Sequence, residues 1–198
     1  MLYFSASNDS FYNVGRAARF LIITFFLLLT SGVANAKIRF PFYVIGNYST
    51  FQTNLGSVQP TAAFGGGTGV ELQLLNKIGL EADLLLIQRK ALFNARYIQL
   101  PIMLRYYILN AIFFGGGYYY AHGLPTIQDL AGSKSISFSK AGLKNDDKGY
   151  LLLVGFQLPF PISPLIELRY SVGQRDVSAV SQVSANYRDA QLLIGLKL

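Results

Sequence analysis

The stretch Tyr97-Ile-Gln-Leu-Pro-Ile-Met-Leu-Arg-Tyr-Tyr107 decides the fold class of this 198-residue chain. Its even-numbered residues, continuing to Ile108, are aliphatic or aromatic, whereas the odd-numbered ones include Gln99 and Arg105. Alternation with a period of two is typical of a β-strand whose two faces meet different surroundings. The stretch therefore predicts a strand with one face turned to lipid and the other turned to a more polar interior.

The same alternation recurs along the rest of the chain. It predicts eight strands, near residues 40–52, 62–75, 78–90, 95–108, 111–122, 148–159, 164–175 and 187–198. Each is close to the ~9 to 11 residues, plus ends, that a tilted strand needs to cross a bilayer. Glycine and aromatic residues occupy both faces of the first and fifth strands, so the pattern leaves their inward face open. We expect an all-β fold, an eight-stranded antiparallel up-and-down transmembrane β-barrel.

The composition excludes several other classes of protein. Hydrophobic residues make up 52% of the chain and charged residues only 14%, against about 25% charged residues in ordinary soluble domains. Outside one N-terminal stretch, no apolar run approaches the roughly 18 to 20 residues of a transmembrane helix, which excludes a multi-span helical membrane protein. There is no cysteine, which excludes disulfides, thiol catalysis, cysteine metal sites and an acylated lipoprotein anchor.

Residues 1–36 have the pattern of a secretory signal peptide, and residues 37–198 would form the outer-membrane β-barrel domain. Arg16 and Arg19 precede the apolar residues 20–29, and Ala34-Asn35-Ala36 fits the small-residue cleavage motif. An uncleaved membrane anchor is the alternative, but the apolar core is short. We expect cleavage before Lys37.

The connections between the predicted strands alternate in length. Short ones fall at residues 76–77, 109–110 and 160–163, and mostly longer, polar ones at 54–60, 90–94, 123–147 and 176–186. Short periplasmic turns and longer extracellular loops are typical of outer-membrane barrels. Aromatic residues gather near both predicted membrane interfaces, as two girdles would require. Those near the turns are Phe42, Tyr43, Tyr106, Tyr107, Phe113 and Phe114, and those near the loops are Tyr48, Phe51, Tyr97, Tyr118, Tyr119, Tyr120, Tyr150 and Tyr187.

Six charged residues fall in mid-strand on the less apolar face. They are Glu71, Glu81, Asp83, Arg105, Glu167 and Arg169. A secreted lipocalin would place them in water, but the girdles, the unequal connections and the low charge favour a membrane barrel, which places them in its lumen. An eight-stranded barrel is just wide enough to be filled by side chains, so we expect a buried ionic network. The two surplus acids leave a proton- or ion-conducting path as the alternative.

A basic excess is predicted at the loop end of the barrel. We expect Arg89, Lys90, Arg96 and Arg188 to contact lipopolysaccharide phosphates there, since Lys and Arg pair readily with phosphate. An ordinary solvated rim is the alternative.

The stretch 97–107 also resembles a strand of the PorT-like family of outer-membrane β-barrel proteins. The aromatic-x-x-aliphatic-Pro-aliphatic-x-aliphatic-basic-Tyr pattern, the glycine-rich strand that follows and the Gly-Leu-Lys-Leu ending carry the likeness. The terminal Leu198 departs from the aromatic residue usual in barrels. The resemblance implies a small Gram-negative outer-membrane barrel, with a role in secretion or envelope assembly.

From these features we expect a structural or interaction protein of the cell outer membrane. Residues 123–147, the longest polar loop, form the expected protein-partner surface. A narrow channel and a lipid-modifying enzyme are the alternatives. Catalysis has little support because His122 is the only histidine and no serine motif accompanies it. One histidine and no cysteine argue against a transition-metal site, and export argues against a nucleic-acid partner; no cofactor is expected.

Overall fold

The computed structural model describes residues 36–54, 56–74, 77–90, 93–109, 111–128, 135–138, 140–179 and 184–198. The predicted signal peptide lies outside these residues, apart from Ala36, and so stays a prediction. Within the described ranges, no helix has the length and apolar character needed to cross a membrane.

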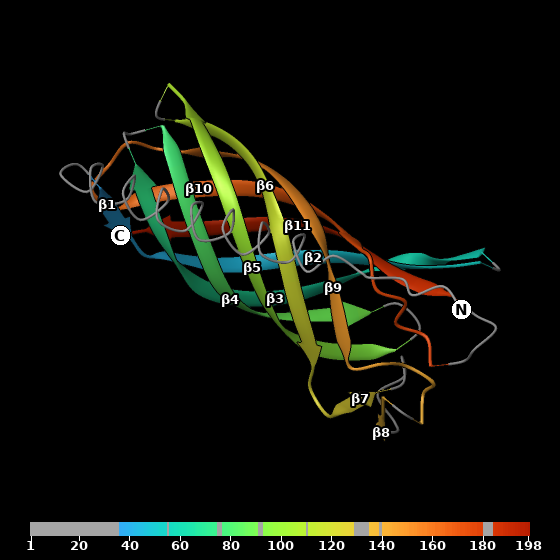
Figure 1. Cartoon of the computed structure of the whole chain (residues 1–198). Helices are drawn as coiled ribbons and strands as arrows, with labels where there is room; N and C mark the ends of the chain where they lie inside the picture. Colours follow the sequence, from blue (N-terminus) through green and yellow to red (C-terminus); the bar gives the residue numbers. More distant parts are fainter. Residues whose placement is uncertain are drawn as a thin grey trace, which may run out of the picture. The chain divides into compact units, whose positions relative to one another are not determined.

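Eight long strands form a closed antiparallel barrel (Figure 1). They are β2 (Pro41–Thr53), β3 (Gly56–Leu74), β4 (Ile78–Lys90), β5 (Asn94–Ile108), β6 (Ile112–Gly123), β9 (Asp146–Gln157), β10 (Ser163–Gly173) and β11 (Ala185–Lys197). Each pairs with the next long strand in the chain, and β11 pairs back onto β2 along its whole length, which closes the sheet. The predicted eight-stranded up-and-down barrel is confirmed.

Three short strands mark the two ends of the barrel (Figure 1). β1 (Lys37–Arg39) pairs with the last residues of β3, at the end we call the turn end. β7 (Thr126–Gln128) and β8 (Ser135–Ser137) pair with each other in the connection from β6 to β9, at the opposite end, which we call the loop end.

Residue parity decides which side chains enter the barrel. In β4 and β5, odd-numbered residues are buried and even-numbered ones mostly exposed. The first and fifth predicted strands, whose faces the sequence left open, obey the same rule: Tyr43 and Ile45 of β2 and Phe113 and Tyr119 of β6 point inward. In all eight barrel strands, therefore, the odd-numbered residues face the lumen.

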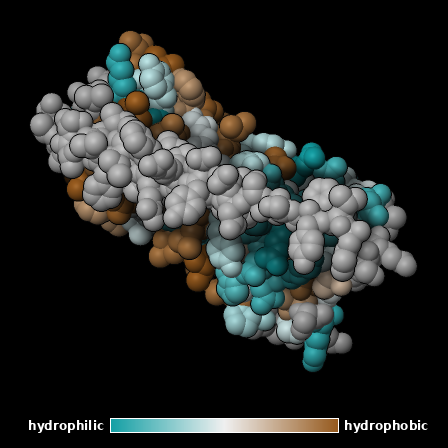
Figure 2. Space-filling model, in the orientation of Figure 1, coloured by the Kyte–Doolittle hydropathy of each residue, from teal (hydrophilic) through white to brown (hydrophobic). Residues whose placement is uncertain are grey.

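The even-numbered residues give the barrel an apolar outer surface. Leu84, Ile102, Leu152 and Leu168 are each more than half exposed. Figure 2 shows hydrophobic residues over the strands and hydrophilic ones gathered toward the loop end. Because closure pairs the backbone groups of every strand, such a barrel can lie in hydrocarbon with its apolar face outward. The protein has the architecture of a transmembrane barrel of the outer membrane.

One of the expected loops is wrong. Thr53 pairs with Gly56, so residues 56–60 prolong the hairpin of β2 and β3 rather than forming a loop. The expected connection at 90–94 lies where β4 ends and β5 begins, with Lys90 paired to Asn94. Proline usually interrupts a strand, and the expected loop ends at Pro60. Here it lies where the register shifts between Ser49 and Phe51, a bulge that tolerates a residue without an N–H group.

The predicted aromatic girdles are only half right. The members that face outward are Phe42, Tyr48, Tyr106, Phe114, Tyr118, Tyr120 and Tyr150. The others are buried in the lumen: Tyr43, Phe51, Tyr97, Tyr107, Phe113, Tyr119 and Tyr187. The sequence predicts where these rings lie along their strands. They are at odd-numbered positions, however, and the side chains at those positions face the lumen.

Gly117 illustrates why the glycine-rich segments lie inside strands. A Cβ atom on this inward-facing residue would lie 2.0 Å from the carbonyl oxygen of Ile102 on β5. The two backbones can approach this closely only without a side chain, which permits the strong strand coiling that a small closed barrel requires.

Candidate functional site

The lumen near the turn end holds a network of charged side chains, which we call the turn-end cluster. Its members are Glu71, Glu81, Asp83, Arg105, Glu167, Arg169 and Lys197. Their strands each contribute inward-facing residues, so parity alone brings them to the same axis. Six of the seven were predicted from the sequence, and the structure brings those six together.

Arg105 lies at the centre of this cluster. Its Nη2 atom is 2.5 Å from Oε1 of Glu81 and 2.6 Å from Oε2 of Glu167, and it also donates to the Tyr43 hydroxyl at 3.2 Å. The guanidinium lies 4.7 Å above the Phe113 ring. The Arg105 side chain is fully buried, so two carboxylates and an aromatic face replace its hydration shell.

Arg169 ties a further acid into the cluster. Its Nη1 atom lies 2.8 Å from Oδ2 of Asp83, and its Nε donates to Glu167. Glu167 therefore bridges the two arginines from one strand face, as alternate residues 167 and 169 of β10 allow.

Lys197 is the member of the cluster that sequence reasoning missed. Its Nζ atom lies 2.7 Å from Oε2 of Glu71 and 3.8 Å from Oε2 of Glu81, while the Tyr107 hydroxyl donates to Glu71. The sequence contains the signal: Leu192, Ile194, Leu196 and Leu198 alternate along the last predicted strand, so Lys197 falls on the opposite, inward face.

A second group, the loop-end cluster, consists of Arg89, Asp147 and Asp189. The Arg89 Nη1 and Nη2 atoms lie 2.8 Å from Asp147 and 2.6 Å from Asp189. The rings of Tyr187 and Tyr97 lie 4.6 and 4.8 Å from the guanidinium carbon. All three charged side chains are fully buried.

The prediction that Arg89 contacts lipopolysaccharide is therefore wrong. Arg89 lies near the loop end of β4. It is an odd-numbered residue, however, so its side chain faces the lumen, as those of Glu81 and Asp83 do. A fully buried guanidinium held by two carboxylates cannot reach a lipid phosphate.

The two clusters share the lumen with buried hydrophobic side chains, among them Ile45, Leu85, Met103 and Leu193. Six acidic and four basic side chains are buried among the described residues. Between the clusters, Gln191 donates to Gln99 across the lumen at 3.2 Å. The arginines at both levels are inaccessible to a water-sized sphere, so the geometry is that of a filled interior rather than an open channel.

The remaining predicted lipid-contact residues do face outward. Arg96 and Arg188 are exposed and Lys90 is half-buried. Lys90 and Arg96 lie on the neighbouring strands β4 and β5, whereas Arg188 lies on β11, which β2 and β3 separate from β4. We call the exposed or half-buried basic residues of the loop end the cationic rim. Its described members are Lys90, Arg96, Lys140, Lys144, Lys148, Arg175 and Arg188.

The acids expected to offset this rim are partly elsewhere. Asp147 and Asp189 are inside the barrel, which leaves Asp146 and Asp176 as its exposed or half-buried acids among the described residues. Arg175 lies 3.5 Å from Asp146. Asp129 and Lys134 lie outside the described residues. The described part of the rim is therefore more basic than the sequence suggested.

His122 lies on the outer face of β6 at this end. Its Nδ1 atom is 2.6 Å from Oδ1 of Asp146, which also accepts from the Tyr120 hydroxyl at 2.7 Å. The His122 side chain is 53% exposed. Ser133 and Ser139 lie outside the described residues. Within the described ranges, no three His, Asp or Glu side chains are arranged to hold a metal ion.

A ring contact and a carboxylate are among the contacts that hold the loop segments at the barrel rim. Phe138 is buried and packs edge-on against Tyr97, with ring centroids 5.7 Å apart. In the connection between β10 and β11, the Asp176 carboxylate accepts N–H bonds from Ala185 at 2.9 Å and Ser178 at 3.0 Å. These two amide bonds, that of Ala185 first, lower the pKa of Asp176 below its ordinary value.

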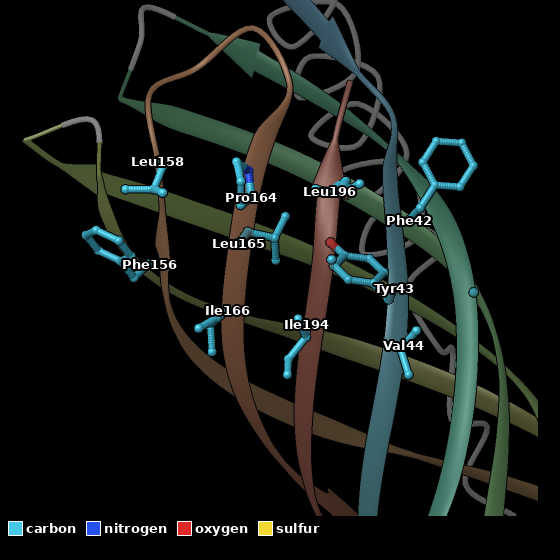
Figure 3. A pocket seen from close by; sticks show the side chains of 12 residues that line it. Phe42, Tyr43, Val44, Phe156, Leu158, Pro164, Leu165, Ile166, Ile194 and Leu196 are labelled. Atoms are coloured by element: carbon cyan, nitrogen blue, oxygen red, sulfur yellow. The ribbon is translucent and has the colours of Figure 1, made fainter.

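A shallow apolar groove of about 650 Å³ lies at the turn end, over β2, β9, β10 and β11. Phe42, Phe156, Ile166 and Ile194 are among the residues that line it (Figure 3). The side chains are those of the lipid-facing surface, so the groove belongs to the membrane contact of the barrel.

The chain is similar to known proteins in its structure but not in its sequence. No family model matches the chain, and no curated protein matches it in sequence. Among solved structures it is similar to Neisserial surface protein A (12% identity, TM-score 0.49, covering 83% of this chain and 98% of that one). It is also similar to Ail, the attachment invasion locus protein of Yersinia pestis (12%, 0.48, 81% and 98%), and to the outer membrane protein OprG from Pseudomonas aeruginosa (14%, 0.46, 80% and 94%). The roles of these proteins are not transferred to this chain.

Proposed function

We propose that this outer-membrane barrel is a structural and interaction protein that is sealed along its axis and acts through its loop end. The burial of Arg89 and Arg105 at two levels of the lumen carries the proposal. A buried charge that is held by two carboxylates is costly to displace, so each level forms a fixed barrier to ions. No catalytic step is assigned to the protein.

The loop end supplies the surface for interaction. The connection from β6 to β9 is the longest between barrel strands, and its described part contains the β7 and β8 hairpin. Phe138 anchors this connection against Tyr97, so the hairpin is presented from a fixed point on the rim. Long loops on a rigid scaffold commonly carry binding functions, which supports residues 123–147 as the partner surface.

The cationic rim supports contact with the outer leaflet. Lys90, Arg96 and Arg188 point away from the lumen near the loop end, the end at which an outer-membrane barrel meets the outer leaflet. Arginine pairs with phosphate through two parallel hydrogen bonds and lysine through a point charge. We therefore propose Lys90, Arg96 and Arg188 as contacts for lipopolysaccharide.

The likeness of residues 97–107 to PorT-like proteins adds a biological setting to the proposal, which is envelope assembly or secretion. It rests on that sequence motif, since no family model matches the chain.

Planar-bilayer recording of the purified protein tests the sealed lumen. We expect no stable conductance steps, because the guanidinium groups of Arg89 and Arg105 and their acids occupy the axis. The double variant Arg89→Ala, Arg105→Ala, which removes both barriers, should show measurable ion flux if it inserts. Lys77→Ala, an exposed position at the turn end, is the matched control. Stable steps from the unmodified protein would replace the proposal with the narrow channel.

A further inference from the structure

A polar cavity of about 410 Å³ lies at the turn end, and we call it the vestibule. It is lined by Lys37, Arg39, Gln73, Gln157, Pro159, Phe160 and Pro161. Outer-membrane barrels have their short turns in the periplasm, so the vestibule faces that compartment.

Strand β1 points two cations into this space. Lys37 pairs in register with Gln73, and Arg39 pairs with Glu71, on the inward-facing side of β3. Partners in register lie on the same face of a sheet, so both cations face the barrel axis. Ile38 between them faces the other way and is 63% exposed.

The two cations have no acid of their own among the described residues. Neither makes an ion pair with any described side chain, and the acid nearest in register, Glu71, is held by Lys197. No described acidic residue lines the vestibule. The lining therefore has an uncompensated positive charge.

The residues that line the vestibule limit the kind of ligand that it can bind. Ile38 and Phe40 occupy the lipid side of this edge, so a membrane headgroup meets apolar side chains there, not the cations. Pro159, Phe160 and Pro161 form an apolar wall beside the two cations. Cations beside an apolar wall suit an organic anion better than a bare inorganic ion.

We propose that the vestibule binds the carboxylate side chains of an acidic peptide segment in the periplasm. Arg39 supplies the planar fork that binds a carboxylate through two hydrogen bonds, and Lys37 supplies a second, mobile charge. The site is separate from the loop end, so it gives the barrel a second interaction surface on the opposite side of the membrane.

The test is binding of a fluorescein-labelled peptide of alternating glutamate and alanine to the full-length protein in nanodiscs, measured by anisotropy. The double variant Lys37→Gln, Arg39→Gln should bind about tenfold more weakly or worse, as loss of charge-assisted hydrogen bonds predicts. The charge-conserving variant Lys37→Arg, which keeps Arg39, should retain most of the binding. Lys77→Gln is the matched control, since Lys77 is exposed at the same end but does not line the vestibule.

The proposal requires that the peptide with glutamine in place of glutamate does not bind. Equal weakening by Lys77→Gln would overturn it in favour of diffuse attraction, as would unchanged binding by the double variant. Displacement of the peptide by millimolar inorganic phosphate would also overturn it, since the site would then take any small anion. Failure of the loop-end proposal would leave these results unaffected.

Discussion

Arg89 and Arg105 show how much one residue position can decide. Both lie at odd-numbered positions, both are fully buried, and both bridge two carboxylates. Arg105 was assigned to the lumen by parity and lies there, whereas Arg89 was assigned to the rim by its height along the strand and does not. Near the end of a barrel strand, the face on which a residue lies therefore predicts its surroundings better than its position along the strand does.

Substitution of Arg105 by methionine tests how much the turn-end cluster contributes to the free energy of unfolding. Removing one partner of a buried ion pair leaves uncompensated charge, which costs about 3 to 5 kcal/mol. We expect the free energy of unfolding of Arg105→Met, measured by urea titration in lipid vesicles, to fall by that amount. Adding Glu81→Gln and Glu167→Gln should recover part of the loss, because the orphaned charges are then removed. Exposed Lys77→Met should change stability little, and a similarly small loss for Arg105→Met would contradict the network.

At the scale of the element, the loops are more firmly held than their composition suggests. Phe138 is 1% exposed, and a Cβ atom on Gly123 would lie 2.4 Å from its ring. Gly123 thus gives the ring of Phe138 room to pack at the rim. The sequence marked residues 123–147 as polar and long, but gave no sign that one aromatic residue returns to the core, since that requires the closed rim to exist first.

The connection from β10 to β11 should loosen in acid. The amides of Ala185 and Ser178 hold the pKa of Asp176 below its ordinary value, which is about 4. The carboxylate therefore stabilises the folded connection fully above that ordinary pKa, and the contribution is lost as the pH falls through the lowered one. Hydrogen exchange at Ala185 and Ser178, corrected for its intrinsic pH dependence, should become faster on acidification.

In Asp176→Asn this acid-dependent step should be absent, since the amide side chain does not titrate. If the variant and the unmodified protein show the same step, then another group is responsible.

At the scale of the whole molecule, most of the described charged side chains lie in three places. Ten charged side chains are buried in the lumen, the cationic rim surrounds the loop end, and Lys37 and Arg39 face the vestibule. The lipid-facing surface between the two ends is apolar. This sorting explains how a chain with only 14% charged residues can have a polar core and a basic surface at each end.

Stability in different lipids tests the cationic rim. Each Lys or Arg near an anionic membrane surface contributes about 1 kcal/mol of attraction. We expect the triple variant Lys90→Gln, Arg96→Gln, Arg188→Gln to melt at a lower temperature than the unmodified protein in bilayers with lipopolysaccharide, and at the same temperature in phosphatidylcholine. Lys77→Gln, at the other end, controls for the loss of positive charge. If the triple variant melts at the same temperature as the unmodified protein in bilayers with lipopolysaccharide, then the rim does not bind lipopolysaccharide and is only solvated.

Much of the fold was predictable because alternation reports the two faces of a strand directly. The segments 78–90 and 95–108 were predicted to within one residue of β4 and β5. The lumenal position of Glu81, Asp83, Arg105, Glu167 and Arg169 followed from the same pattern. The hairpin of β2 and β3 was not predictable in this way, because a bulge at Pro60 hides the continuity of the strand.

The sequence by itself determined most of the strands, and the inward faces of those with clear alternation, because side-chain parity is a local property of extended backbone. The tertiary structure alone decided the partners. That Lys197 neutralises Glu71, that Arg89 joins Asp147 to Asp189, and that Lys37 and Arg39 face one cavity all depend on strand register and closure. Those contacts join residues far apart in the chain, and only the closed barrel brings them within reach of one another.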